Sequence, residues 1–230
     1  MFLTTTWKDF EVLDTGDGEK LERWGGVILR RPDPQTIWPK ADPALWKQAQ
    51  AHYHRSERGG GEWEFFTRLP ERWTISHQGL KFYVRPTGFK HTGLFPEQAA
   101  NWVWMAEKIR ESGRRDVKVL NLFGYTGGAT LACAQAGATV THVDAAKGMV
   151  QWAKENRELS QLPETSCRWI VEVQAHVHDH RRNARLHSLQ RSRNPQIRCK
   201  SFIGQRNQRQ DHHGRQNRSQ YRHGNSWNAR

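Results

Sequence analysis

An α/β fold with a doubly wound parallel sheet is predicted by three features in the middle of the chain. Apolar residues recur through 117–122 as in a strand buried in a sheet, and the Gly-rich turn 123–128 follows directly. Small residues then predict a helix over 129–136. A second apolar strand, 139–143, ends on Asp144. A strand, a glycine turn, a helix, a second strand and an acid, in this order, form the first unit of such a sheet.

The elements that continue this unit can also be placed. Gly137 suits the left-handed C-cap of the first helix, and Cys133 within that helix is expected to be a small core residue. A further helical pattern covers 146–159. Residues 168–171 begin another apolar strand, which Glu172 ends.

The first 86 residues predict a small β-rich module ahead of this α/β unit. Short strands are expected within 7–31, around a strong turn signal at 15–18, and a mixed, partly helical segment follows them. Further strands are predicted at 63–66, 73–77 and 80–84, the last two joined by a hairpin turn at 77–79. Most of the many tryptophans of this module are expected to form its core.

Between the two parts, residues 97–111 predict an amphipathic helix. Ala100, Val103, Trp104 and Ile109 are expected on its buried side. The predicted organisation is therefore a β-rich module over 1–86, the first half of an α/β domain over 87–172, and a basic tail over 173–230.

The glycine turn and the acid behind it indicate a ligand site. Gly124, Gly127 and Gly128 allow a ligand to approach the backbone and allow positive φ angles. Asp144 follows Gly124 by twenty positions, which suits a carboxylate that accepts both hydroxyls of a ribose. The G-x-x-G-G spacing favours a mononucleoside without phosphates over a pyrophosphate, and so disfavours a nicotinamide-dependent oxidoreductase. The alternative is a turn that merely connects strand to helix.

The turn sequence Val-Leu-Asn-Leu-Phe-Gly-Tyr-Thr-Gly-Gly, at 119–128, resembles the cofactor motif of class I S-adenosylmethionine-dependent methyltransferases. More narrowly, it is similar to the large-subunit ribosomal RNA methyltransferase I-like group. The stretch Lys-His-Thr-Gly-Leu-Phe-Pro-Glu-Gln, at 90–98, resembles a second motif of that group. The resemblance covers roughly residues 7–172 and implies an incomplete Rossmann-like methyltransferase sheet.

S-adenosyl-L-methionine (SAM) is the cofactor that this resemblance implies. The residues implied to bind it come from the turn, from the acids that end the strands and from the second motif: Asn121, Phe123, Gly124, Tyr125, Thr126, Gly127, Gly128, Asp144, Ala145, Glu172, His91, Thr92 and Gln98. Within this set, the resemblance implies that Glu172 stands where the family places an acid that receives the adenine amino group.

The resemblance also implies an RNA substrate, with ribosomal RNA favoured, and an enzyme of RNA methylation. No catalytic residue is assigned. The family positions the target base with an Asp-Pro-Pro-type loop after the fourth strand, but Asp-Pro occurs here only at 33–34 and 42–43, in the front module. The chain is therefore expected to be truncated in its catalytic half and to be weakly active or inactive.

Charge is concentrated in the last 58 residues. Residues 173–230 hold twelve Arg and one Lys against two Asp and no Glu, which accounts for +11 of the total net charge of +13. Apolar residues are sparse there and show no periodicity, so disorder is expected. Three explanations stay open: an RNA-binding basic tail, a histidine metal tract (His176, His178, His180, His212 and His213), or an out-of-frame reading of the gene, which we favour.

No other feature indicates a metal, a membrane or secretion. His52 and His54 share a strand-face spacing, but no third ligand is evident nearby, so solvated or capping histidines are expected. Three unpaired-looking cysteines and the lack of an apolar run approaching 18 residues predict a soluble, cytoplasmic protein. The rival function from another class is a non-catalytic RNA-binding protein that uses its Arg-rich C-terminal tail.

Overall fold

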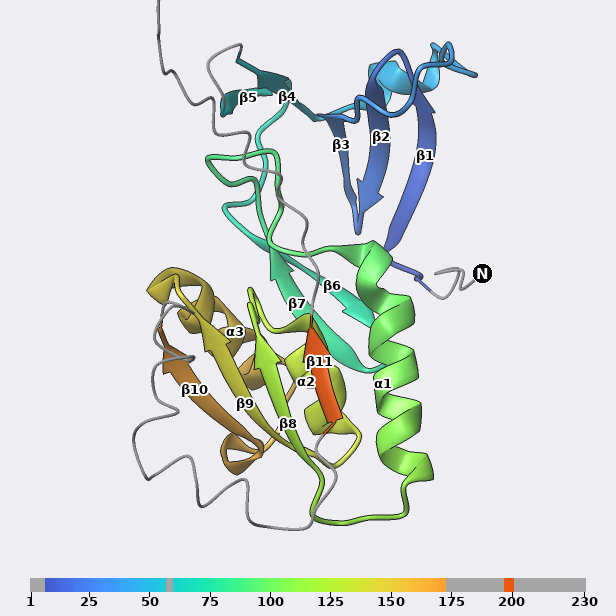
Figure 1. Ribbon diagram of the computed structural model, residues 1–230. Coiled ribbons are helices and arrows are strands. Elements are labelled where there is room, and N and C mark those ends of the chain that lie inside the picture. The colour runs from blue at the N-terminus through green and yellow to red at the C-terminus, as the bar shows by residue number, and fades with distance from the viewer. Residues whose placement is uncertain (1–6, 57–59, 173–196, 201–230) are drawn as a thin grey trace, which may run out of the picture.

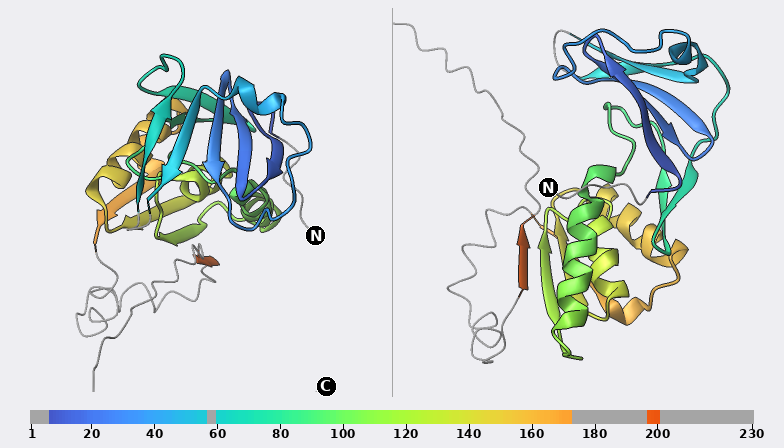
Figure 2. Two further views of the ribbon diagram at one scale, coloured as in Figure 1. Left: turned by 90° about the horizontal axis from the view of Figure 1, so that it is seen from above. Right: turned by 90° about the vertical axis from the view of Figure 1, so that its right-hand side faces the viewer.

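The structure is a computed structural model that describes residues 7–56, 60–172 and the backbone of 197–200. It contains a five-stranded sheet, a two-stranded hairpin and a four-stranded parallel sheet (Figure 1). The five-stranded sheet lies above the parallel sheet, and the hairpin lies between them (Figure 2). The predicted α/β class with a β-rich front module is confirmed, and within the described residues the parallel sheet is incomplete, as expected.

The front module is built on the five-stranded sheet, whose strands follow chain order. They are β1 (Phe10–Gly16), β2 (Glu19–Trp24), β3 (Val27–Pro32), β4 (Ala51–Arg55) and β5 (Gly61–Phe65). Neighbours are antiparallel except β3 and β4, which run parallel. The predicted turn at 15–18 joins β1 to β2, and a short 3-10 helix, Leu45–Gln48, lies in the partly helical segment. Strand β4 is not among the predicted strands.

The hairpin comprises β6 (Trp73–His77) and β7 (Leu80–Val84), as predicted. Gln78 and Gly79, with φ of 48° and 86°, make the left-handed turn between them. Residues of the front module, the hairpin and the α/β part share one hydrophobic cluster, which includes Trp24, Phe82 and Trp102. A domain boundary at 86 stays a prediction.

The parallel sheet has the strand order β10-β9-β8-β11. Its strands are β8 (Lys118–Leu122), β9 (Thr139–Asp144), β10 (Cys167–Val171) and β11 (Ile197–Lys200), and all their pairings are parallel. The expectation of disorder over 173–230 is wrong for 197–200, whose backbone pairs with β8. The rest of 173–230, with the tail explanations that concern it, lies outside the described residues. The order of the sheet reverses at β8, which is the topological switch point of an open α/β sheet.

Three helices accompany this sheet: α1 (Ala99–Glu111), α2 (Gly128–Gln135) and α3 (Lys147–Leu159). Helices α2 and α3 lie on the same face, because both right-handed crossovers step in the same direction, from β8 to β9 to β10 (Figure 2). Gly137, with φ of 98°, follows α2 as the predicted left-handed residue, and Cys133 within α2 is buried, as expected.

The buried face of α1 differs from the prediction by about one residue. Ile109 is buried as predicted, but the other large buried side chains are Trp102 and Met105, whereas Ala100 and Val103 are half-buried and Trp104 is 44% exposed. The reason is the neighbouring helix, since Trp102 packs directly on Gly128, where a glycine admits the ring. Within the described ranges, no helix combines the length and apolar character needed to cross a membrane.

Candidate functional site

Most of the predicted site residues lie where three parallel strands end at the same edge of the sheet. The turn 123–128 follows β8, Asp144 ends β9, and Glu172 follows β10. The backbone N–H of Glu172 donates to the carbonyl of Asp144 at 3.0 Å, so the last two ends are in direct contact. In open α/β sheets, ligands bind outside the carboxyl ends of the strands, at the switch point.

Asp144 is held at the turn by two backbone hydrogen bonds. Its Oδ2 accepts the N–H of Tyr125 at 2.9 Å, and its Oδ1 accepts the N–H of Ala146 at 2.9 Å. These bonds direct the half-buried carboxylate toward the glycine turn rather than into bulk water. An ionised carboxylate offers about four acceptor positions, so about two stay available to hydroxyl donors.

The glycines of the turn serve packing more than the prediction assumed. Only Gly127 among them has a left-handed φ, 94°, while the other left-handed residues of the turn are Phe123 and Tyr125, at 58° and 51°. A Cβ on Gly124 would lie 2.3 Å from the ring of His142, and one on Gly128 would lie 2.4 Å from the ring of Trp102. These two glycines admit buried aromatic rings beneath the turn.

The second predicted motif meets the turn through Gly93. Thr126, fully buried, donates from Oγ1 to the carbonyl of Gly93. The rings of Phe95 and Tyr125 are 5.2 Å apart, and burial raises the pKa of Tyr125 to about 12, so its phenol stays protonated. The loop at 93–95 and the turn at 125–126, about 30 positions apart in sequence, therefore form one wall of the candidate site.

The remaining residues of this motif differ in their surroundings. Burial, together with the charges of Arg31 and Lys90, lowers the pKa of His91 to about 4, so its imidazole is neutral near pH 7. Thr92 is fully buried, and its Oγ1 has no hydrogen-bond partner among the described residues. Gln98 accepts from Asn101 at 2.9 Å and so is engaged by the first turn of α1.

Asn121 lies beneath the turn rather than beside it. Its Nδ2 donates to Thr130 Oγ1 at 2.8 Å, and that oxygen lies 2.9 Å from His142 Nδ1. All three side chains are buried. Burial also lowers the pKa of His142 to about 4, so this network is neutral. Phe123 and Ala145, in contrast, are exposed at the edge of the sheet.

Two positioning residues were not identified from the sequence. Asn156 of α3 is fully buried, donates to the Thr126 carbonyl at 2.9 Å and accepts the N–H of Tyr83 at 2.8 Å, so it ties the turn to β7. Arg31 of β3 donates to the Lys90 carbonyl at 2.8 Å and pairs with buried Glu22 at 2.6 Å. A polar residue within an otherwise apolar helix face is the one sequence signal that Asn156 gives.

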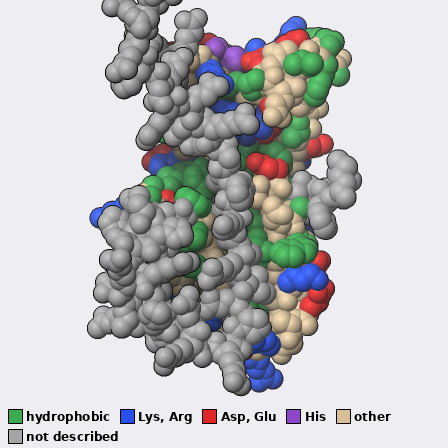
Figure 3. Space-filling model, viewed as in Figure 1, with side chains coloured by type: hydrophobic (Ala, Val, Ile, Leu, Met, Phe, Trp, Pro, Cys, Tyr) green, Lys and Arg blue, Asp and Glu red, His purple; other side chains and the backbone are tan. Residues whose placement is uncertain are grey.

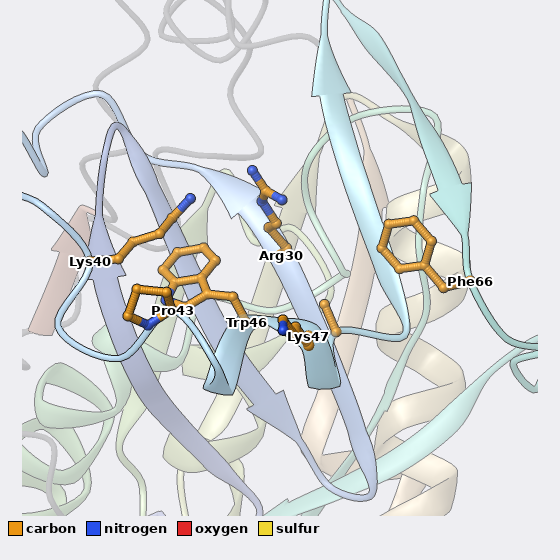
Figure 4. Close-up of a pocket in the computed structure, with 7 residues that line it drawn as sticks. Arg30, Lys40, Pro43, Trp46, Lys47 and Phe66 are labelled. Atoms are coloured by element: carbon orange, nitrogen blue, oxygen red, sulfur yellow. The ribbon is translucent and has the colours of Figure 1, made fainter.

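A second feature lies on the front module. A surface hollow of about 560 Å³ is lined by basic and aromatic side chains, which are Arg30, Lys40, Lys47, Trp46 and Phe66, together with Pro43 and Ala49 (Figure 4). Lys40 lies 4.2 Å above the ring of Trp46. The hollow is far along the chain from the strand ends and holds none of the predicted cofactor residues.

A family model described as S-adenosylmethionine-dependent methyltransferase matches residues 46–168, more than half of the chain. The chain belongs to this family. The match includes β8, the glycine turn and Asp144, so the arrangement at the strand ends is that of a methyltransferase-family domain. The family resemblance of the turn motif is thereby confirmed.

Curated relatives are named ribosomal RNA large subunit methyltransferase K/L. The protein of Magnetococcus marinus is 34% identical over 132 residues, which are 57% of this chain and 18% of that protein. The protein of Shewanella oneidensis is 42% identical over 85 residues, which are 36% of this chain and 11% of that protein. The chain thus spans less than a fifth of the length of these relatives.

Solved structures similar to this chain include methyltransferases. A SAM-dependent methyltransferase from Agrobacterium tumefaciens is 40% identical with a TM-score of 0.72, covering 77% of this chain and 57% of that one. A methyltransferase solved with SAH is 20% identical with a TM-score of 0.60, covering 80% of this chain and 50% of that one, which shows the shared fold.

Proposed function

We propose that this chain binds SAM at the carboxyl edge of its parallel sheet and belongs to an enzyme that methylates RNA, with ribosomal RNA as the substrate class. Asp144 carries the proposal. It ends β9, beside the glycine turn that follows the switch-point strand β8, and keeps acceptor capacity after its two backbone hydrogen bonds.

The residues present fit this cofactor. Asp144 would accept the two ribose hydroxyls, and Glu172, at the end of the neighbouring strand, would accept from the adenine amino group. The exposed ring of Phe123 lies at the same edge and would cover an apolar ligand face. The loop at 91–95 is held to the turn by Thr126, so it would close the opposite side of the site.

When bound, SAM supplies an electrophilic methyl group on its sulfonium. The task of this chain is therefore to orient the ligand and keep the site dry, which Asn156 and Thr126 serve by fixing the turn. We assign no catalytic residue, because methyl transfer needs alignment more than acid–base chemistry.

RNA as the substrate is supported by the printed names of the curated relatives and by the hollow of the front module. The exposed Lys47 would contact a phosphate there, and the exposed ring of Phe66 would stack on a base. The rival function, RNA binding by the Arg-rich tail, falls on residues outside the described part. Deleting 173–230 would separate the two, since a tail binder loses its salt-dependent RNA affinity.

The cofactor proposal is tested by calorimetric titration of the full chain with S-adenosylhomocysteine. The Asp144→Ala variant should bind at least about tenfold more weakly, because hydrogen bonds to a charged acceptor contribute roughly 1.5–3 kcal/mol each. Asp144→Asn should bind with intermediate affinity, since an amide oxygen keeps one acceptor.

Asp116→Asn is the matched control, because this exposed acid just before β8 pairs with Arg114 and lies outside the site. Circular dichroism should show that each variant is folded. Equal affinity of folded Asp144→Ala and of the unmodified chain, or no binding by the folded unmodified chain, would contradict the proposal.

A further inference from the structure

Two histidines and a glutamate meet on the front module, away from the strand-end site. His52 and His54 are two positions apart on β4 and therefore point to the same face of the sheet. Their ring centroids are 3.9 Å apart. Glu64 of β5 pairs with His52 in the antiparallel register, which brings a carboxylate to the same face. One ligand atom from each residue lies within 4.8 Å of the other two.

Glu64, the third candidate ligand, could not be identified from the sequence. Glu64 is ten positions from His54, and only the pairing of β4 with β5 brings the two together, with His54 Nε2 2.7 Å from Glu64 Oε2. The side chains of His54 and Glu64 are 47% and 54% exposed, so an ion can reach the cluster from solvent. Histidine side chains reach the surface in this part of the molecule (Figure 3).

Glu19 provides the outer support that metal-binding histidines commonly have. Its Oε1 lies 2.8 Å from His52 Nε2. A neutral imidazole that donates Nε2–H to this carboxylate presents Nδ1 as the ligand atom, and such a carboxylate also fixes the orientation of the ring. Arg30 and Lys40 both pair with Glu19, and Lys40 also lies 3.9 Å from Asp17, so two carboxylates face these two positive charges beside the cluster.

We propose that His52, His54 and Glu64 bind one divalent transition-metal ion of the zinc type. Two imidazoles and one carboxylate form a three-ligand set that suits Zn²⁺, with water at the fourth position. Mg²⁺ prefers a shell of oxygen ligands and is disfavoured by the two nitrogen ligands. The site is independent of the strand-end cofactor site, so either can fail without the other.

The test is a calorimetric titration of the full chain with Zn²⁺ after treatment with a chelator and dialysis. His54→Ala and Glu64→Gln should each weaken one binding event at least about tenfold, and Glu19→Gln should weaken it about tenfold, as an outer-shell change does. Glu71→Gln is the matched control, because Glu71 is also exposed but lies outside the cluster.

Co²⁺ gives a second readout, which reports the coordination geometry of the bound ion rather than its affinity. Four-coordinate cobalt should produce intense visible absorption in the unmodified chain, and folded His54→Ala should lose it. The histidines of 173–230 could also take up metal, but that uptake would not respond to His54 or Glu64. Zn²⁺ titration curves and cobalt spectra that stay unchanged in both folded variants would overturn the proposal, as would a weak, octahedral cobalt spectrum in the unmodified chain.

Discussion

The glycine turn and the charged face of the front module are organised in opposite ways. The charged face is the cluster of Glu19, Arg30, Lys40 and His52 on the five-stranded sheet. At the turn, backbone groups make most of the contacts, and Asp144 is the acid that they hold. On the front module, side chains bind side chains: Glu19 alone contacts Arg30, Lys40 and His52, which come from three other segments. The turn is therefore fixed by local sequence, whereas the charged face exists only once distant strands have paired.

The largest expected effect breaks a buried ion pair on the opposite face of the same sheet, between Arg31 and Glu22. Arg31→Met should lower the free energy of unfolding by about 3–5 kcal/mol, because it removes the buried partner of the Glu22 carboxylate, 1% exposed, and leaves it the half-buried Lys20 at 3.1 Å. Burial opposes ionisation of Glu22, but the charges and hydrogen bonds of Arg31 and Lys20 outweigh it and lower its pKa. Urea unfolding monitored by tryptophan fluorescence measures the loss.

The double variant Glu22→Gln/Arg31→Met is its control. It removes both charges, so it should lose clearly less stability than Arg31→Met alone. If the double variant is the less stable of the two, the contribution of Arg31 comes from its packing on Trp24 and its bond to the Lys90 carbonyl instead.

The corresponding test at the turn adds one methyl group. Gly124→Ala should destabilise the fold by about 1–3 kcal/mol, because its Cβ would lie 2.3 Å from the ring of His142. In a His142→Ala background the same substitution should cost much less. Thermal unfolding of the four proteins gives the coupling, and an equal cost in both backgrounds would show that Gly124 serves another purpose.

Sequence reasoning succeeded where neighbours along the chain decide the structure. The strand, turn and helix of residues 117–137 depend on apolar periodicity and on glycines at set positions, and both are visible in the letters. The hairpin turn at 77–79 was predictable for the same reason. The position of Asp144 at the turn followed from strand order, since the carboxyl ends of neighbouring parallel strands meet.

Prediction failed where partners are distant. The buried face of α1 is set by Gly128 beneath Trp102, and nothing near Trp102 in the sequence indicates that glycine. Asn156 binds the turn from another helix, and Glu64 joins His54 only through strand pairing. The pairing of 197–200 with β8 lies in a stretch without an apolar period, so no pattern could have identified it.

A pH experiment refines the comparison at the charged face. Burial opposes ionisation of Glu19, but hydrogen bonds from Arg30 and Lys40 and their charges lower its pKa to about 2, from 4.5. Because the folded pKa is the lower one, the stabilisation is complete above 4.5 and is lost as the pH falls from 4.5 toward 2. Glu19→Gln should therefore show a shallower fall of unfolding free energy over this window. An identical pH profile for both proteins would contradict the pairing.

The smallest effect is expected from a charge pair that joins the hairpin to the α/β part at the surface. Arg72 Nη1 lies 2.6 Å from Glu155 Oε2, with side chains 47% and 33% exposed. Such a pair contributes about 0–1 kcal/mol and is screened by salt, so Glu155→Gln should cost less than about 1 kcal/mol, and nothing in concentrated salt. The substitution keeps the contact of Arg72 with the ring of Tyr83, at 4.0 Å, so urea unfolding isolates the charge. A loss as large as that of Arg31→Met would mean that burial does not separate strong from weak ion pairs in this molecule.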